Sequence, residues 1–202
     1  MADLQIYGIA RSRAFRVLWA AKELGLDYDH HQIGFDGSNR TPEYLAVNPL
    51  GAVPAIVDHG FKLSESLAIN LYLAKRAGSG LYPASLEDEA RTWQWTLFAA
   101  TELDFPILDW ARHTTVLPPE KRDPAVAAKA LATLAPKLGH LDATLRDRPY
   151  LLGERFTIAD LNVASVMYRL LWGDLTQTPA AKAWLDRCYD RPAAREARAL
   201  RE

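Results

Sequence analysis

Cysteine is almost absent from this chain, which contains only Cys188. A single cysteine cannot form an internal disulfide, and it excludes a CxxC redox or zinc motif. An excess of either charge is also missing, because 24 Lys and Arg residues are balanced by 25 Asp and Glu residues. Such a chain lacks the electrostatic footprint of a protein that binds nucleic acid or an anionic membrane. We therefore expect neither nucleic acid nor a membrane among its partners.

Long apolar runs and targeting signals are missing as well. No segment approaches the roughly 20 apolar residues that a membrane-spanning helix requires. Residues Met1 to Gln5 contain no basic segment followed by an apolar run, so they do not resemble a secretory signal. The five histidines lack the spacing of metal ligands, and no metal site is expected. Together these absences favour a cytoplasmic protein.

Residues 1–78 alternate between strand and helix patterns. Strands are expected at Leu4 to Tyr7, Tyr28 to Ile33, Ala55 to Val57 and Phe61 to Leu63. Helices are expected at Ser12 to Leu24, at a short segment beginning with Pro42, and after an N-cap at Ser64. The resulting order, βαβαββα, combines a parallel crossover with a terminal hairpin. It predicts a small α/β domain of the thioredoxin type.

The rest of the chain has no strand pattern. A linker is expected at residues 79–86 and an all-α domain at residues 87–202. Pro106 should kink or interrupt a long helix from Leu86 to about His113, and Pro136 should kink or break a later one. Thr157 and Asp160 have the spacing of a capping box, which we interpret as folding chemistry. The second domain is therefore predicted to be helical throughout.

Two short segments of the first domain suggest a ligand site. Val53-Pro54 precedes a strand that looks buried, and a cis bond there would turn the Val53 N–H and C=O outward. Glu65 and Ser66 lie in the first turn of a helix, whose N-terminus offers unpaired N–H groups to a carboxylate. The Glu65 carboxylate can take an ammonium group. This pattern suits the α-amino acid end of a ligand.

The segments Asn48-Pro49-x-Gly51-x-Val53-Pro54 and Leu63-x-Glu65-Ser66-x-Ala68-Ile69 resemble the glutathione-binding half of the soluble, cytosolic glutathione S-transferases. The resemblance is to bacterial-like members and is closest to the serine-type classes. It implies a cis Pro54, backbone pairing of Val53 with the cysteinyl part of glutathione, and a γ-glutamyl end held by Glu65 and Ser66. It also implies that Arg40 binds the glycine carboxylate. Glutathione is thus the expected co-substrate.

The resemblance leaves the group that activates the thiol open. A thiol is a poor nucleophile until it is deprotonated, and the family lowers its pKa with a hydroxyl donor. Ser12, at the start of the first helix, is our first candidate, although the serine-type register falls one residue earlier, near Arg11. Tyr7, at the end of the first strand, is the alternative. If neither serves, Arg11 or backbone N–H groups would stabilise the thiolate.

The expected activity is conjugation of glutathione to a small hydrophobic electrophile, as in cytoplasmic detoxification. The electrophile should lie on an apolar wall formed by the long helix and the loop after Tyr7. The candidate contacts are Ile9, Phe105, Trp110 and His113. A glutathione-dependent peroxidase or isomerase is a variant, and a non-catalytic binding or assembly module of the same fold is the alternative. The family resemblance also implies a homodimer.

Overall fold

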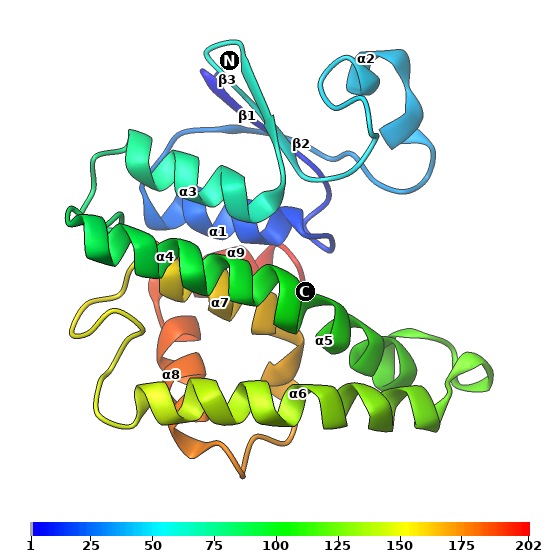
Figure 1. Cartoon of the computed structure of the whole chain (residues 1–202). Coiled ribbons are helices and arrows are strands. Elements are labelled where there is room, and N and C mark those ends of the chain that lie inside the picture. Colours follow the sequence, from blue (N-terminus) through cyan, green and yellow to red (C-terminus); the bar gives the residue numbers. More distant parts are fainter. Residues whose placement is uncertain (1) are drawn as a thin grey trace. The chain divides into compact units, whose positions relative to one another are not determined.

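The computed structural model describes residues 2–202, which form two compact units (Figure 1). The first unit combines Met1–Tyr82 with Asp190–Glu202, and the second is Pro83–Tyr189. The sequence-based division assigned all of residues 87–202 to the helical domain, whereas the packing places Asp190–Glu202 in the first unit. The physical reason is that α9 (Pro192–Ala199) packs on α1 (Ala14–Glu23).

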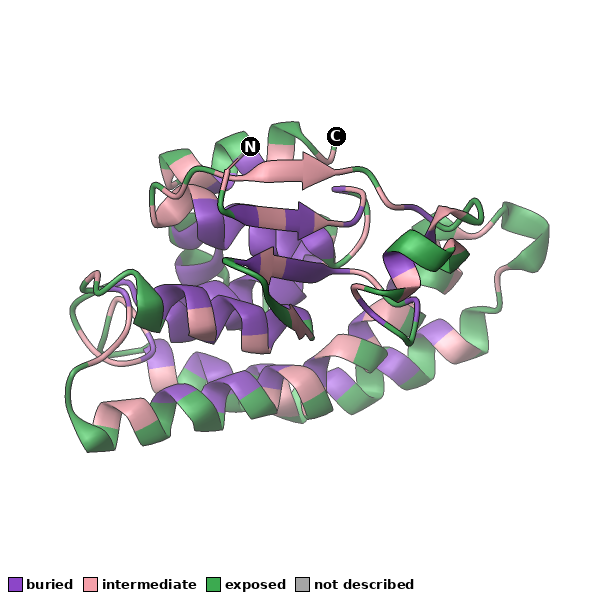
Figure 2. Ribbon diagram, turned by 90° about the horizontal axis from the view of Figure 1, so that it is seen from above, coloured by how far each residue is buried: buried purple, intermediate pink, exposed green. Residues whose placement is uncertain are grey.

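A four-stranded mixed sheet organises the first unit, in the order β2-β1-β3-β4. The strands are β1 (Leu4–Tyr7), β2 (Asp29–His31), β3 (Ala55–Asp58) and β4 (Phe61–Ser64). β1 runs parallel to β2, and β3 runs antiparallel to both β1 and β4. Figure 2 shows the two central strands mainly buried and the two outer strands more exposed. The predicted thioredoxin-like domain, with its crossover and hairpin, is confirmed.

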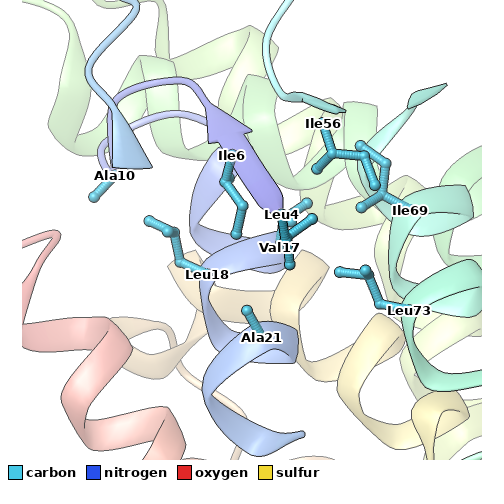
Figure 3. Close-up of a cluster of buried hydrophobic side chains, with 9 residues drawn as sticks. All are labelled: Leu4, Ile6, Ala10, Val17, Leu18, Ala21, Ile56, Ile69 and Leu73. Carbon is cyan, nitrogen blue, oxygen red and sulfur yellow. The ribbon is translucent and has the colours of Figure 1, made fainter. Parts of the chain in front are cut away.

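One face of this sheet carries the core of the first unit. Leu4 and Ile6 alternate with more exposed neighbours along β1, so their side chains point to the same face. α1 and α3 (Ser66–Arg76) pack against each other. Figure 3 shows apolar side chains of the sheet, of the turn after β1 and of both helices in one cluster: Leu4, Ile6, Ala10, Val17, Leu18, Ala21, Ile56, Ile69 and Leu73. This burial fixes the helices relative to the strand ends.

The second unit is helical in all its regular elements, as predicted. Its helices are α4 (Leu86–Phe98), α5 (Asp104–Ala111), α6 (Pro124–Leu145), α7 (Ile158–Val166) and α8 (Pro179–Tyr189). α5 packs on α6, α4 on α7, and α6 on α8. Short turns of 3-10 helix occur in both units, at Ser38–Arg40, Pro119–Lys121 and Met167–Trp172. Across residues 2–202, no helix has both the length and the apolar character needed to cross a membrane.

Pro106 and Pro136, the two prolines expected to disturb helices, have different effects in the structure. A π-helical turn, Ala99–Leu103, separates α4 from α5 just before Pro106, so the predicted interruption is confirmed. A second π turn, Arg112–Val116, follows α5. α6 continues through Pro136, and a break there is therefore wrong. Packing of α6 against both α5 and α8 outweighs the backbone hydrogen bond that proline removes.

Asp160 forms the buried centre of the predicted capping box. Its Oδ1 accepts hydrogen bonds from Leu151 N (2.8 Å) and Trp184 Nε1 (2.9 Å). Its Oδ2 accepts from Thr157 N (2.9 Å) and Thr157 Oγ1 (3.0 Å). Burial raises the pKa of the Asp160 carboxyl, while these four donors favour the carboxylate. One side chain thus joins the start of α7 to α8 and to the turn before α7.

Replacing Asp160 should destabilise the protein strongly. Asp160→Ala leaves four buried donors without their acceptor, and each such group costs roughly 1–3 kcal/mol. We expect the free energy of unfolding, measured in urea, to fall by about 3 kcal/mol or more. The free energy of unfolding of Asp160→Asn should lie between those of the wild type and of Asp160→Ala, because the NH₂ group of asparagine faces donors where the carboxylate had an acceptor oxygen. Asp186→Ala, which removes an exposed carboxylate paired with Lys182 on α8, is the control and should change little. Equal effects of the two alanine variants would refute this role of Asp160.

Candidate functional site

The register of the sheet brings three predicted site segments to one end of it. Tyr7 pairs with Ala55, and Ala55 pairs with Ser64, so these residues form one row across β1, β3 and β4. β1 ends at this row, β3 begins at it, and β4 ends at it. The loop after β1, the Val53-Pro54 segment and the Glu65-Ser66 turn therefore leave the sheet at the same end.

Val53-Pro54 has the geometry that the family resemblance implied. The peptide bond between them is cis. None of the hydrogen bonds among residues 2–202 uses the Val53 N–H or C=O. A side chain at Gly8 would lie 3.1 Å from the Val53 Cβ and 2.8 Å from the Ala14 Cβ. Glycine at this position therefore lets the end of β1, the start of α1 and the cis-proline segment approach closely.

The loop before Val53 is held by side chains from its own neighbourhood. Asn48 is buried, donates from Nδ2 to Ala52 O (2.7 Å) and accepts at Oδ1 from Leu50 N (3.2 Å). The Tyr44 hydroxyl also donates to Ala52 O. Asn48 thus stabilises the turn. Arg40 is exposed, and its Nη1 donates to Leu50 O (3.3 Å) beside this loop.

The start of α3 differs from the sequence-based prediction. Ser64 belongs to β4, and the helix begins at Ser66 after Glu65, so the predicted Ser64 cap is wrong. Glu65 has φ 70°, a left-handed conformation that non-glycine residues rarely adopt and that clusters at functional sites. Its side chain is exposed, while Ser66 is buried. A strained acid thus lies directly before the electropositive N-terminus of a helix.

Arg16 of α1 is a buried cation behind this helix start, and the sequence analysis missed it. Its Nη1 donates to Ser66 Oγ (3.3 Å), and the arginine is 7% exposed. A charged residue within the apolar run Phe15 to Leu18 was the available signal, because arginine is rarely buried without a function or a partner. The guanidinium adds positive charge where the helix N-terminus already favours an anion.

Ser12 lies in the turn that joins β1 to α1. Its hydroxyl donates to Ile9 O (2.7 Å) and accepts from Ala14 N (3.0 Å). Ser12 N donates to Ile9 O as well (2.9 Å), so residues 9–12 form a tight turn. The hydroxyl proton is therefore directed at the backbone in this structure. Rotation about the Cβ–Oγ bond redirects the proton while the oxygen stays in place.

Tyr7 is at the same end of the sheet but in a different environment. Its hydroxyl donates to Gln5 Oε1, and its ring stacks on His31 with the centroids 4.5 Å apart. Gln5 and Tyr7 point to the face opposite the core residues Leu4 and Ile6. Burial raises the pKa of Tyr7. Arg11 is exposed and donates to main-chain oxygens of the segment after α9.

The four predicted contacts of the electrophile are divided between the units. Ile9 belongs to the first unit, where its N–H donates to Ile33 O (2.9 Å). The other three belong to the second unit, in α5 and the π turn after it. Phe105 is 65% exposed, whereas the Trp110 ring packs near Gly173. His113 Nδ1 accepts from Asp123 N (2.9 Å), so His113 also supports a loop.

Two family models match the chain. They are Glutathione S-transferase, N-terminal domain, over residues 2–75, and Glutathione S-transferase, C-terminal domain, over residues 105–192. Glutathione S-transferase 3 of Zea mays is 32% identical over 212 residues, which cover 96% of this chain and 92% of the relative. Elongation factor 1-gamma 2 of Oryza sativa subsp. japonica is 34% identical over 166 residues. That match covers 80% of this chain but only 38% of the relative, so the chain spans little more than a third of its length.

Solved structures give the same result. A theta class glutathione S-transferase from Xanthomonas axonopodis pv. citri, with glutathione bound, is 32% identical with a TM-score of 0.91. The similarity covers 98% of this chain and 97% of that one. A glutathione S-transferase-I bound with lactoylglutathione is 30% identical with a TM-score of 0.90, covering 98% and 99%. Matched in both domains, and over nearly its whole length by such enzymes, the chain belongs to the glutathione S-transferase family.

Proposed function

We propose that this protein binds glutathione at the described end of the sheet and conjugates its thiolate to a small hydrophobic electrophile, as a cytoplasmic detoxification enzyme. The observation that carries the proposal is the convergence of three features on one row of the sheet. These are the unused backbone groups of Val53, the strained Glu65, and the start of α3 with its buried cation. Similar structures contain glutathione or lactoylglutathione.

Each part of glutathione has a chemically suited group in the first unit. Ser66, the α3 N-terminus and Arg16 suit the carboxylate of the γ-glutamyl residue. Glu65 suits its ammonium group. Val53 presents an N–H and a C=O for backbone pairing with the cysteinyl residue, and Arg40 suits the glycine carboxylate.

The chemistry that glutathione supplies is a thiol, which becomes a strong nucleophile once ionised. We assign the task of stabilising the thiolate to Ser12, whose hydroxyl lies in the turn directly after β1. Ile9, Phe105, Trp110 and His113 remain our proposed contacts for the electrophile. A peroxidase or isomerase reaction would use the same thiol site with a different second substrate.

The first test follows the ionisation of bound glutathione. We expect the wild-type protein to lower the pKa of the bound thiol below that of free glutathione. Ser12→Ala should raise the pKa by about one unit, because a hydrogen-bond donor to the thiolate is lost, and one unit is a tenfold change in the ionisation constant. Tyr7→Phe should leave it unchanged, since the Tyr7 hydroxyl is bonded to Gln5. Thiolate absorbance across a pH titration measures all three proteins.

If Tyr7→Phe alone raised the pKa of the bound thiol, the assignment of Ser12 would be overturned, but the transferase function would stand. If the wild-type protein does not bind glutathione, or binds it without shifting the thiol pKa, the transferase proposal fails.

A second test concerns Arg16. We expect Arg16→Met to weaken glutathione binding about tenfold, because the anion site at the start of α3 loses its buried cation. Binding of γ-aminobutyryl-cysteinylglycine, which lacks the α-carboxylate of the γ-glutamyl residue, should change little. Arg16→Lys, which keeps the charge, should retain part of the affinity. Calorimetric titration of both ligands measures the difference, and parallel losses for the two ligands would contradict the carboxylate assignment.

The non-catalytic alternative is favoured by one observation. Several relatives, including elongation factor 1-gamma of Homo sapiens at 33% identity, are named elongation factors rather than transferases. The matched region covers 91% of this chain and 43% of that relative. In this alternative the chain serves as an assembly module. It would then bind partner proteins without lowering the pKa of a bound thiol, which the first test distinguishes.

A homodimer is part of the proposal. Leu86, Trp93 and Leu97 recur at helical spacing along α4 and are 75%, 47% and 57% exposed. An exposed apolar stripe of this kind is typical of an interface. We expect Trp93→Glu to convert a dimer into a monomer in light scattering coupled to size-exclusion chromatography. Leu131→Glu, at an exposed apolar position of α6, is the matched control and should leave the dimer intact. A Trp93→Glu protein that remains dimeric would exclude this stripe.

A further inference from the structure

Arg201 binds the turn that carries Ser12. Its Nη1 donates to Ala10 O (2.9 Å) and to Ser12 O (3.0 Å), so one nitrogen joins two carbonyl groups of this turn. The guanidinium also lies over the Phe15 ring, 5.5 Å from its centroid. In return, Arg11 donates from Nε to Arg201 O (3.3 Å). These contacts tie the turn to the segment that follows α9.

The position of Arg201 is fixed by α9, which packs on α1. Glu23 of α1 pairs with Arg191 just before α9, and Lys22 of α1 pairs with Glu196 within it (3.1 Å). Glu23 is shielded, since its side chain is 7% exposed. The two ion pairs hold α9 along α1. The residues that follow α9 therefore lie near the N-terminal end of α1. Arg201 therefore contacts the turn from a segment that α9 holds in place.

The carbonyl groups that Arg201 binds determine the direction of the neighbouring amides. In a trans peptide the C=O and the next N–H point in opposite directions. Because Ala10 O points at Arg201, the Arg11 N–H points away from it. None of the hydrogen bonds among residues 2–202 uses that N–H. The Ser12 hydroxyl belongs to the same turn, so both of these donors depend on the backbone that Arg201 holds.

We propose that Arg201 is a positioning residue for thiol activation, which holds the turn of residues 9–12 so that the Ser12 hydroxyl and the Arg11 N–H can donate to the sulfur of bound glutathione. The inference rests on the proposed function. In this proposal the thiol is activated by a turn that Arg201, near the other end of the sequence, holds in position. The thiol's proton passes to solvent, and the two donors stabilise the thiolate that remains.

The test uses Arg201→Met, which keeps an unbranched apolar stem but removes the charge and the donors. We expect the pKa of the bound thiol to rise by about one unit, and kcat to fall about tenfold at a pH well below the wild-type pKa of the bound thiol. The affinity for S-methylglutathione, which has no thiol to ionise, should stay within about twofold of wild type. Arg201→Lys should restore part of the loss, because its ammonium can donate to the same carbonyl groups.

Arg195→Met is the matched control. It removes one positive charge from α9, but Arg195 pairs with the exposed Asp190 and does not touch the turn. Arg195→Met should leave the pKa of the bound thiol at its wild-type value. Equal shifts in the Arg195 and Arg201 variants would show a general charge effect and overturn the proposal. The proposal would also be overturned if Arg201→Met left the pKa of the bound thiol unchanged, or if it weakened the binding of S-methylglutathione in parallel. If the wild-type protein itself fails to shift the thiol pKa, the proposed function fails, and this inference fails with it.

Discussion

The row Tyr7–Ala55–Ser64 is the constraint on which the candidate site depends. Backbone pairing fixes these residues side by side, and every candidate ligand group of the first unit except Tyr7 lies in a segment attached to that end of the sheet. A slip of one residue would turn Leu4, Ile6 and Ile56 away from the helices, so burial of the core enforces the register. The core and the site are therefore consequences of one pairing. This explains how short strands of three or four residues can place loops accurately.

Glu65 illustrates how the surrounding structure holds a conformation that the residue would not choose. A φ of 70° is unfavourable for a residue with a Cβ, yet β4 ends at Ser64 and α3 begins at Ser66. Ser66 is bonded to buried Arg16, and Ile69 N donates to Glu65 O (2.9 Å). Both neighbours are thus fixed, and Glu65 must bridge them. The backbone thus presents an exposed acidic side chain directly before the start of α3.

The sequence predicted the features that depend on local patterns. The strands, the crossover, the helical second unit and the Thr157–Asp160 capping box follow from periodicity, turn residues and spacing. The misplaced Ser64 cap shows the limit, because β4 pairing with Ala55 competes with capping for the same residue. Arg16 and Arg201 were not found for another reason. Their partners are 50 and about 190 positions away, and no pattern within a helix reports such a contact.

The residues proposed to bind glutathione and the turn proposed to activate its thiol have different supports in this chain, and the difference bears on how one fold serves both transferases and elongation factors. Val53, Glu65 and Ser66 are held by the sheet and its helices, which every folded copy must keep. The turn of residues 9–12 also receives two hydrogen bonds from the guanidinium of Arg201, which lies outside the sheet. If Arg201 has the proposed positioning role, a change confined to the segment after α9 alters activation while the candidate ligand groups of the sheet stay in place. Under that proposal, loss of thiol activation would require no loss of the fold.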